Sequence, residues 1–331
     1  MIFDCFTFFN ELDLLEIRLH TLKDVVDKFV IAEATRTYTG KPKELVFDKN
    51  RSRFAEFKDK IVHVVVDNLL PEEEVSKDSY NLPWINENRQ RNALIKGLSN
   101  VDDGDVIIVS DVDEIPRPER IAEAVFLAKN GDVVRFEQEI FAYYLNFRDY
   151  RNPYWHLGSI ALSWNTFCTS SLLDAVKSDR FTVQSECQGR VIQKVRFLAP
   201  TVLLRRSGWH MTYMGGAKKI QEKIMAFSHQ EAKVVLGKVE SRLQRGENVL
   251  CGQRDNFAVR MTESTFPSYV IANKDRFKEL IFPVSDEYLG KTRLLRLIAT
   301  VKGVAYRFLV KLVPRCLEGP LIALRNKIFF R

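Results

Sequence analysis

The stretch VIIVSDVDEIPRPE, from Val106 to Glu119, changes from apolar to acidic residues within a few positions. Its first four residues are apolar and β-branched, which is typical of a strand covered on both faces. Asp111 and Asp113 follow, and carboxylates at positions i and i+2 of an extended chain point to the same side. Folding gains nothing from packed negative charge at a strand end. The pattern therefore predicts that these two side chains bind a positively charged partner.

The segments around this stretch predict an α/β fold. Four apolar segments have the composition of strands: 2–9, 28–34, 60–66 and 105–109. They alternate with segments whose apolar residues recur at helical spacing: 10–26 and 84–100. Such alternation indicates βαβ units and a largely parallel sheet, which binds ligands at the carboxyl ends of its strands. The second half is less regular, with helices expected at 118–129, 215–229 and 236–245 and strands at 132–147 and 158–164.

The charge of the chain is concentrated at its end. Of the 331 residues, 46% are apolar and 28% charged, as in an ordinary globular protein. The formal charge is +7, but residues 290–331 hold ten Lys and Arg against one acid, which leaves 40 bases and 42 acids in residues 1–289. A nucleic-acid protein carries its basic surface on the folded domain, so we expect no nucleic-acid partner. We predict a domain at 1–288 and a basic tail at 289–331.

The cysteines and the start of the chain predict a cytoplasmic protein. The five cysteines form no CxxC pair and are odd in number, which favours a reducing compartment. The first residues include an acid, Asp4, and no basic segment, so we expect no signal peptide. No stretch reaches the roughly 18 apolar residues that a membrane span needs.

The tail is predicted to form an amphipathic helix over 291–313, ended by Pro314. Its apolar arc comprises Leu294, Leu297, Ile298, Val301, Ala305, Phe308 and Leu312. Bases cluster beside the arc, which is the pattern of a helix lying in the interface of an anionic membrane. We therefore expect peripheral binding at the inner face of the membrane; the alternative is an ordinary helix docked on the domain.

Hard carboxylate oxygens, as in Asp111 and Asp113, are the ligands that Mg²⁺ and Mn²⁺ prefer, and such a cation neutralises a diphosphate. The alternative is a surface turn or a helix start, where aspartate is common. Because the pair follows a buried strand within a βαβ array, we favour the metal site.

Several blocks of sequence together resemble glycosyltransferase family 17. They are FNELDLLEIRL, DKFVIAEATRTYTGKPKEL, SDVDEIPRPE, SGWHMTYMGG and PSYVIANKDRFKELI, in order over about residues 2–283. The resemblance implies a GT-A-like, Rossmann-like α/β fold with a mixed sheet flanked by helices. It also implies a UDP-GlcNAc donor, a divalent cation (Mn²⁺ or Mg²⁺) and inversion at the transferred sugar. The Golgi anchor of the animal members has no counterpart here, so we expect a glycan or a lipid-linked saccharide as acceptor.

The resemblance also suggests roles for residues near the first two strand ends. GT-A folds hold the uracil and ribose after the first strand, where this chain has Asn10 and Glu11. Asn10 could instead be only a helix N-cap. Glu33, which ends a buried strand, is the stronger nucleotide candidate.

Other candidates lie on the helix before Asp111 and near residue 210. One of Arg89 and Arg91, with Asn92 nearby, is expected to support the diphosphate or the aspartates. The alternative is a solvated helix face on which Glu87 pairs with an arginine. GT-A enzymes often bring a late histidine to the metal, which makes His210 a candidate third ligand; otherwise it is a core histidine.

An inverting transfer needs a general base for the acceptor hydroxyl, and the candidates are Glu137, Glu139, Glu186 and Asp255. We take Glu137, on one strand face with Glu139, as the candidate, although an exposed polar face explains the pair equally well.

Two rival functions share these features. A metal-dependent phosphohydrolase of the haloacid-dehalogenase type would carry a nucleophilic Asp near the N-terminus and a DxDxT motif, whereas position 115 is Ile. A catalytically inactive glycan-binding or scaffold protein would keep the fold, but retention of both aspartates argues against it.

Overall fold

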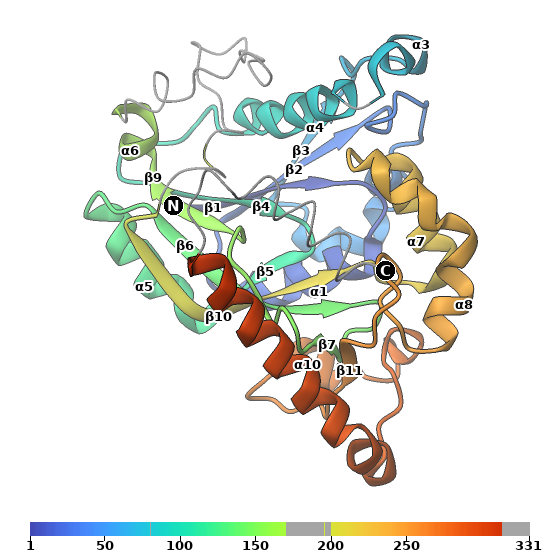
Figure 1. Ribbon diagram of the computed structural model, residues 1–331. Helices are drawn as coiled ribbons and strands as arrows, with labels where there is room; N and C mark the ends of the chain where they lie inside the picture. The colour runs from blue at the N-terminus through green and yellow to red at the C-terminus, as the bar shows by residue number, and fades with distance from the viewer. Residues whose placement is uncertain (80, 170–194, 196–199, 313–331) are drawn as a thin grey trace.

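The computed structural model describes residues 1–79, 81–169, 195 and 200–312. Within these residues the strands join into one mixed sheet with helices on both faces (Figure 1). This confirms the predicted α/β class. The helices are α1 (Leu12–Leu22), α2 (Val46–Lys49), α3 (Glu72–Val75), α4 (Leu82–Asn92), α5 (Pro118–Lys129), α6 (Trp164–Thr169), α7 (Gly216–Ala226), α8 (Val239–Gln244), α9 (Ser268–Ala272) and α10 (Asp286–Leu312).

The first half of the chain forms the parallel part of the sheet. Its strands lie in the order β3 (Ile61–Val66), β2 (Lys28–Ala34), β1 (Ile2–Phe8) and β4 (Val106–Asp111), each parallel to its neighbours. Their carboxyl ends therefore meet at one edge. Thr7 pairs with Asp111 in the register of β1 and β4, so the acidic loop begins where the two central strands end.

The second half extends the sheet with antiparallel and parallel pairs. Beyond β4 lie β9 (Ile160–Ser163), β6 (Val134–Ala142), β7 (Phe147–Asp149) and β11 (Asn256–Ala258). The long strand β10 (Val202–Thr212) runs parallel to β6 and antiparallel to β5 (Glu114–Pro116), while β8 (Tyr154–Trp155) pairs with β6. Because β5 follows the acidic loop directly, its pairing with β10 brings His210 opposite Glu114.

Both faces of the parallel strands are buried. Side chains alternate along β1, so Phe6 and Phe8 pack with α1 and α5 on one face. Phe3 and Cys5 pack on the other face with the 3₁₀ segment Ala93–Gly97 that follows α4. Burying each large apolar side chain contributes about 1.5–3 kcal/mol, so two covered faces hold the strand ends in fixed positions.

The expected elements agree with the structure except at some boundaries. The predictions 28–34 and 118–129 coincide with β2 and α5. The segment 132–147 was expected to be one strand, but β6 ends at Ala142 because Tyr143 adopts a left-handed conformation with φ 75°. The predicted helix at 84–100 ends at Asn92 and continues as the 3₁₀ segment.

The predicted tail helix is present, and it starts earlier than expected. It forms the later part of α10, which begins at Asp286 and crosses the predicted boundary at 288 without interruption. The tail beyond Leu312 lies outside the described residues. In the part of the chain that the structure describes, no helix is long and apolar enough to cross a membrane.

Candidate active site

The first carboxylate of the acidic loop is held by the strand beside it and by α4. Asp111 Oδ1 accepts hydrogen bonds from Thr7 Oγ1 at 3.0 Å and from Arg91 Nη2 at 2.7 Å. Arg91 also donates to Glu87 Oε1 at 2.9 Å. Burial alone would lower the pKa of Arg91, but the carboxylates of Asp111 and Glu87 raise it above its ordinary value. Arg91, one of the candidate residues on this helix, therefore reaches the acidic loop.

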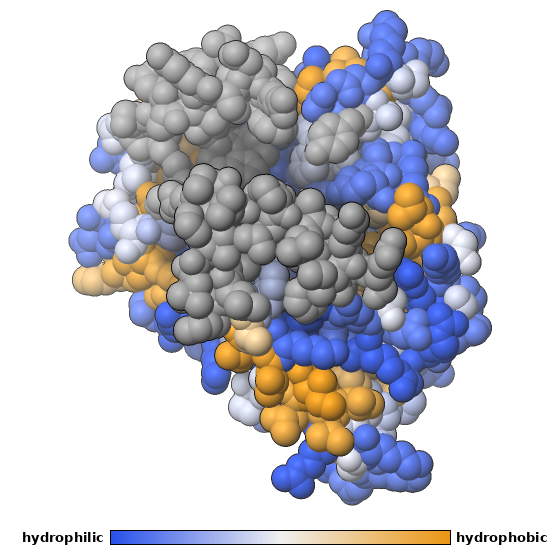
Figure 2. Space-filling model, in the orientation of Figure 1, coloured by the Kyte–Doolittle hydropathy of each residue, from blue (hydrophilic) through white to orange (hydrophobic). Residues whose placement is uncertain are grey.

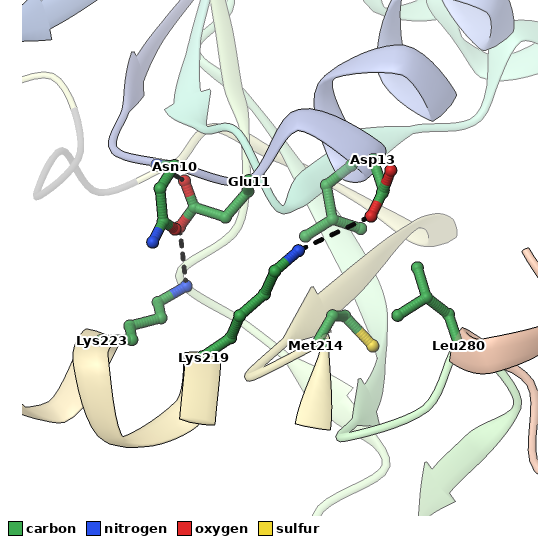
Figure 3. A pocket seen from close by; sticks show the side chains of 9 residues that line it. Asn10, Glu11, Asp13, Met214, Lys219, Lys223 and Leu280 are labelled. Carbon is green, nitrogen blue, oxygen red and sulfur yellow. Dashed lines mark hydrogen bonds and ion pairs between the residues drawn. The ribbon is translucent and has the colours of Figure 1, made fainter. Parts of the chain in front are cut away.

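The second carboxylate faces α7. Asp113 is buried, and its Oδ2 accepts a hydrogen bond from Lys223 Nζ at 2.9 Å. Lys223 Nζ also lies 3.3 Å from Glu11 Oε1, as Figure 3 shows. Burial would raise the pKa of Asp113, but the charges of Lys223 and His210 outweigh it and hold this pKa below its ordinary value. The same two carboxylates, Asp113 and Glu11, raise the pKa of Lys223 against the effect of burial.

A fully buried arginine fixes the backbone of the acidic loop. Arg18 on α1 forms an ion pair with Asp4 on β1, and its Nη2 donates to Ser110 Oγ at 2.6 Å. Its Nη1 donates to the carbonyl oxygens of Asp111 (3.0 Å) and Glu114 (2.7 Å). The Glu114 carbonyl also accepts the Ser159 hydroxyl at 3.1 Å, and the guanidinium adds a charged donor to both buried carbonyls, which holds the loop backbone in place.

The side chain of Glu114 also forms hydrogen bonds that hold the acidic loop. Its Oε2 accepts the backbone N–H of Asp111 at 3.0 Å, and its Oε1 accepts the indole N–H of Trp155 at 2.8 Å. The Trp155 ring in turn packs against His210, with centroids 4.9 Å apart. Glu114 therefore links the aspartate, the tryptophan and the histidine without itself facing solvent.

His210 lies beside Asp113. Its Nε2 is 3.8 Å from Asp113 Oδ1, and its buried Nδ1 has no hydrogen-bond partner. Two carboxylates and an imidazole are a suitable donor set for Mn²⁺ or Mg²⁺. In the present side-chain positions, however, the described residues contain no group of three His, Cys, Asp or Glu side chains that could hold a metal. Asp111 and Asp113 are instead neutralised by Arg91 and Lys223, so a cation would have to displace Lys223.

Asn10 and Glu11 line a narrow pocket next to the acidic loop (Figure 3). The pocket measures about 20 Å³, and Lys219 and Lys223 from α7 are among the residues that line it. Lys219 Nζ lies 3.7 Å from Asp13 Oδ2. Asn10 is not the N-cap of α1: that position is Glu11, whose carboxylate accepts the N–H groups of Phe9 and Asn10.

The other predicted nucleotide residues, Glu33, Arg89 and Asn92, are not among the residues that line this pocket. Glu33 is buried at the end of β2, where its carboxylate accepts the Phe47 N–H at 3.0 Å and contacts His63 and Lys43. Arg89 donates to the Asn68 carbonyl at 2.8 Å. Asn92 is buried in α4. These contacts tie Glu33 and Arg89 to neighbouring protein groups.

The candidate bases lie on the second half of the sheet. Glu137 Oε2 accepts the N–H of Arg206 at 3.2 Å, and Glu139 forms ion pairs with two arginines. Asp255 Oδ2 lies 3.3 Å from Arg151 Nη1. Glu186 lies outside the described residues. None of the contacts in the described chain joins Glu137, Glu139 or Asp255 to Asp113, and the role of Glu137 as general base stays a prediction.

Arg18 and Lys223 contact the acidic loop, but neither was predicted from the sequence to belong to the site. Arg18 left a signal in the sequence, because a charged residue interrupts the apolar spacing of Leu14, Leu15 and Leu22, and the buried strand β1 carries an acid at Asp4. Lys223 left none, since it is one of several lysines in an ordinary helical segment.

The acidic loop follows β4, one of the central strands in the parallel part of the sheet, which is the position expected from the resemblance to a glycosyltransferase. Residues 1–159 match the model of glycosyltransferase family 17, which confirms the resemblance for that part of the chain.

The chain is similar to three proteins named beta-1,4-mannosyl-glycoprotein 4-beta-N-acetylglucosaminyltransferase. The proteins from Homo sapiens and Rattus norvegicus are 34% identical over 113 residues, and that from Mus musculus is 33% identical. Each alignment covers 32% of this chain and 20% of the relative, so the match spans about a fifth of the relatives' length.

Two solved structures of S. aureus TarS were also found, each with 11% sequence identity. Their TM-scores are 0.36 and 0.35, and both alignments cover 92% of this chain, with 53% and 88% of the TarS chains covered. TM-scores at this level do not establish a shared fold.

Proposed function

We propose that this protein is a metal-dependent, inverting glycosyltransferase that transfers GlcNAc from UDP-GlcNAc to a glycan or a lipid-linked saccharide. One observation carries the proposal: Asp111 and Asp113 lie together at the carboxyl ends of the central strands, within the part of the chain that matches family 17. The GlcNAc donor is inferred from the names of the similar proteins.

The chemistry of the site fits the departure of a nucleoside diphosphate. Asp111, Asp113 and His210 would hold the cation, which when bound supplies positive charge to the leaving diphosphate. Lys223 would then leave Asp113, and its ammonium would be placed to contact a phosphate oxygen. Arg91 and Arg18 hold the loop in place through Asp111 and the loop carbonyls.

A donor-binding experiment tests this assignment. UDP-GlcNAc with Mn²⁺ should raise the melting temperature of the wild-type protein, as expected for a ligand that binds only the folded state. The variant Asp113→Asn should stay folded and lose most of this shift, because one metal ligand is gone.

The matched control is Asp103→Asn, which makes the same change at an exposed position near the same strand. If Asp113→Asn kept the wild-type shift and its dependence on Mn²⁺, the donor site would have to be elsewhere. In a separate incubation of the wild-type protein with UDP-GlcNAc and Mn²⁺, release of free phosphate in place of UDP would favour a phosphohydrolase.

We also propose that α10 holds the protein at the inner face of an anionic membrane. The helix docks on the domain through its small and polar side. Ala299 is buried, and Gly303 packs so closely that a Cβ there would lie 2.0 Å from the Arg151 carbonyl oxygen. Arg296 and Arg307 donate to groups on the domain or its own helix: the Tyr150 hydroxyl, the Leu289 carbonyl and the Arg151 carbonyl.

The apolar side of α10 consequently faces outward, as the orange patch along this helix shows (Figure 2). Leu294, Leu297, Val301 and Val304 are 65%, 60%, 58% and 54% exposed, at the spacing of one helix face. Arg293 and Lys302 on this helix are exposed. At an anionic membrane surface, each such base contributes about 1 kcal/mol to the free energy of binding. The thiols of Cys5 and Cys251 are free, which is consistent with the cytoplasmic side.

Liposome flotation of the full chain tests the membrane proposal. Wild-type protein should float with anionic vesicles at low salt, whereas Leu297→Glu/Val301→Glu should not, because two charges would enter the acyl boundary. The control is Val234→Glu, at a residue that is 81% exposed elsewhere on the surface. Equal flotation of all three proteins would overturn the proposal, and so would failure of the wild type to float.

A further inference from the structure

A second cavity, separate from the narrow pocket that Asn10 and Glu11 line, is lined mainly by arginines. It measures about 610 Å³. We call it the arginine cavity, and its lining residues are Arg117, Glu119, Arg120, Glu139, Arg148, Arg205, Arg206, Ser264 and Thr265. It shares no residue with the pocket around Glu11 and Lys223. Its volume lies within the roughly 300–1,000 Å³ of small-molecule sites.

Positive charge in the arginine cavity exceeds negative charge. Five guanidinium groups face two carboxylates. Glu139 forms ion pairs with Arg117 at 3.0 Å and with Arg148 at 2.8 Å, so its charge is already neutralised. Arg205 and Arg206 form no ion pair with any carboxylate of the described residues. Such an excess of cations is suited to an anionic ligand.

The backbone of β10 is distorted where it presents these two arginines. The pairing of β10 with β6 shifts between Leu204 and Gly208, which marks a bulge. Arg206 lies in it with φ 50°, a left-handed conformation that costs an ordinary residue about 1–2 kcal/mol. The buried carboxylate of Glu137 accepts the Arg206 N–H and holds this conformation. Strain of this kind is typical of functional sites.

The guanidinium groups are also held in position by aromatic rings. Arg117 lies over the Trp209 ring at 4.2 Å and is largely buried. Arg206 Nε donates to the Tyr154 hydroxyl at 3.0 Å. Groups fixed in this way lose little freedom when a ligand binds. Because a guanidinium matches phosphate oxygens with two parallel N–H groups, phosphate is the ligand chemistry that these arginines favour.

The arginine cavity lies next to the apolar helix α10. The Tyr150 ring is 5.9 Å from the guanidinium of Arg148 in the cavity and 5.8 Å from that of Arg296 on α10. One side chain therefore separates the cationic cavity from the helix with the exposed leucines. This is the arrangement that an amphiphile with a phosphate head group would require.

We propose that the arginine cavity binds a phosphate or diphosphate group, and that this group belongs to a lipid-linked acceptor. Binding of phosphate follows from the cavity alone, whereas the assignment to the acceptor rests on the proposed transferase function. In this arrangement the acceptor's phosphate occupies the cavity and its hydrocarbon lies along α10.

The first experiment measures the binding of inorganic pyrophosphate by calorimetry without metal. The variant Arg205→Gln/Arg206→Gln should bind at least tenfold more weakly than the wild type. The control Arg254→Gln/Arg260→Gln, which removes the same charge from exposed positions, should change the affinity less than twofold. Asp113→Asn should bind pyrophosphate as the wild type does.

Equal affinity in the wild type and Arg205→Gln/Arg206→Gln would overturn the phosphate site. A changed pyrophosphate affinity in Asp113→Asn, whether weaker or stronger, would move the site to the acidic loop beside Lys223 and overturn it as well. The UDP-GlcNAc-dependent melting shift should persist in Arg205→Gln/Arg206→Gln. An arginine cavity that does not bind phosphate and an acidic loop that does not bind UDP-GlcNAc therefore give different results.

The second experiment distinguishes the two sources of phosphate. Below its critical micelle concentration, dodecyl phosphate should bind more tightly than inorganic phosphate, and Leu297→Glu/Val301→Glu should abolish the difference. Val234→Glu should retain it. Equal affinity of dodecyl and inorganic phosphate for the wild type would overturn the lipid-linked acceptor in favour of a free phosphorylated ligand.

Discussion

Arg18 shows how one side chain can connect folding to the site. Its guanidinium and the Asp4 carboxylate are both fully buried, and the same guanidinium binds two carbonyls of the acidic loop. A buried pair of this kind adds little net stability over an apolar pair, but removing one partner leaves an uncompensated charge. The function of the pair is therefore to fix the loop that carries Asp111 and Asp113.

Arg18→Met should destabilise the protein by about 3–5 kcal/mol, because the Asp4 carboxylate is left buried and unpaired. Arg18→Met/Asp4→Val should regain much of this loss, since both charges are gone. The double variant should still bind UDP-GlcNAc weakly, because the loop carbonyls lack their donor. Chemical denaturation and the donor-dependent melting shift measure the two effects. A double variant with wild-type donor binding would show that the pair serves stability alone.

At the scale of single residues, the sequence indicated those candidate site residues whose type is unusual for their position. Asp111 and Asp113 stood out because they follow a buried strand, and Arg91 because it lay on the helix preceding them. Glu33 was also conspicuous, but its partners His63 and Lys43 come from separate segments that no local pattern connects to it. Lys223 reaches Asp113 across 110 positions, and only the packing of α7 on the strand ends reveals the contact.

At the scale of elements, the turn between β10 and α7 sets the direction from which the lysines enter the site. Tyr213, Gly215 and Gly216 all have positive φ, at 56°, 97° and 80°. Residues with positive φ reverse the chain, so α7 returns with Lys219 facing Asp13 and with Lys223 facing Glu11 and Asp113. Elements of the first half were predictable because regular βαβ alternation leaves few alternatives. In the second half, bulges and left-handed residues interrupt the strands.

Gly215→Ala should destabilise the protein by about 1–2 kcal/mol, since a left-handed alanine is strained. Its Cβ would also lie 2.4 Å from Lys219 Cδ, which would move that flexible side chain. The control is Gly237→Ala, where the added Cβ meets nothing within 4 Å, and its stability should change by less than about 0.5 kcal/mol. Urea denaturation compares the two. Equal stabilities would show that this turn does not require glycine.

At the scale of the whole molecule, two candidate sites are separated across one sheet. The acidic loop and α7 lie at the ends of the parallel strands, while α10 lies by the second half of the sheet (Figure 1). The residues that line the arginine cavity also belong to the second half. The sequence predicted the basic, amphipathic helix, because its spacing is regular over many residues. It could not show that α10 docks through Ala299 and Gly303 with its leucines outward, since that depends on the backbone of Arg151.

Stability of the whole molecule should depend on the protonation of Asp149, at the end of β7. Burial raises the pKa of this carboxyl to about 6, although the N–H groups of Asn152 and Arg151 donate to it. A raised pKa means that the folded state binds the proton more tightly than the unfolded state. The stabilising contribution is full below the ordinary pKa of aspartate, about 3.9, and is lost as the pH rises through about 6.

Asp149→Asn keeps the acceptor oxygen for both N–H groups but cannot ionise. Relative to the wild type, its free energy of unfolding should therefore increase by about 1–3 kcal/mol between pH 4 and pH 7.5, since only the wild type must bury a charge at the higher pH. Asp103→Asn, at an exposed site, should follow the wild type across the same range. Urea denaturation at both pH values measures the difference. A difference between Asp149→Asn and the wild type that does not change with pH would show that Asp149 is already ionised in the folded protein at pH 4, and that the contacts of its carboxylate compensate for burial.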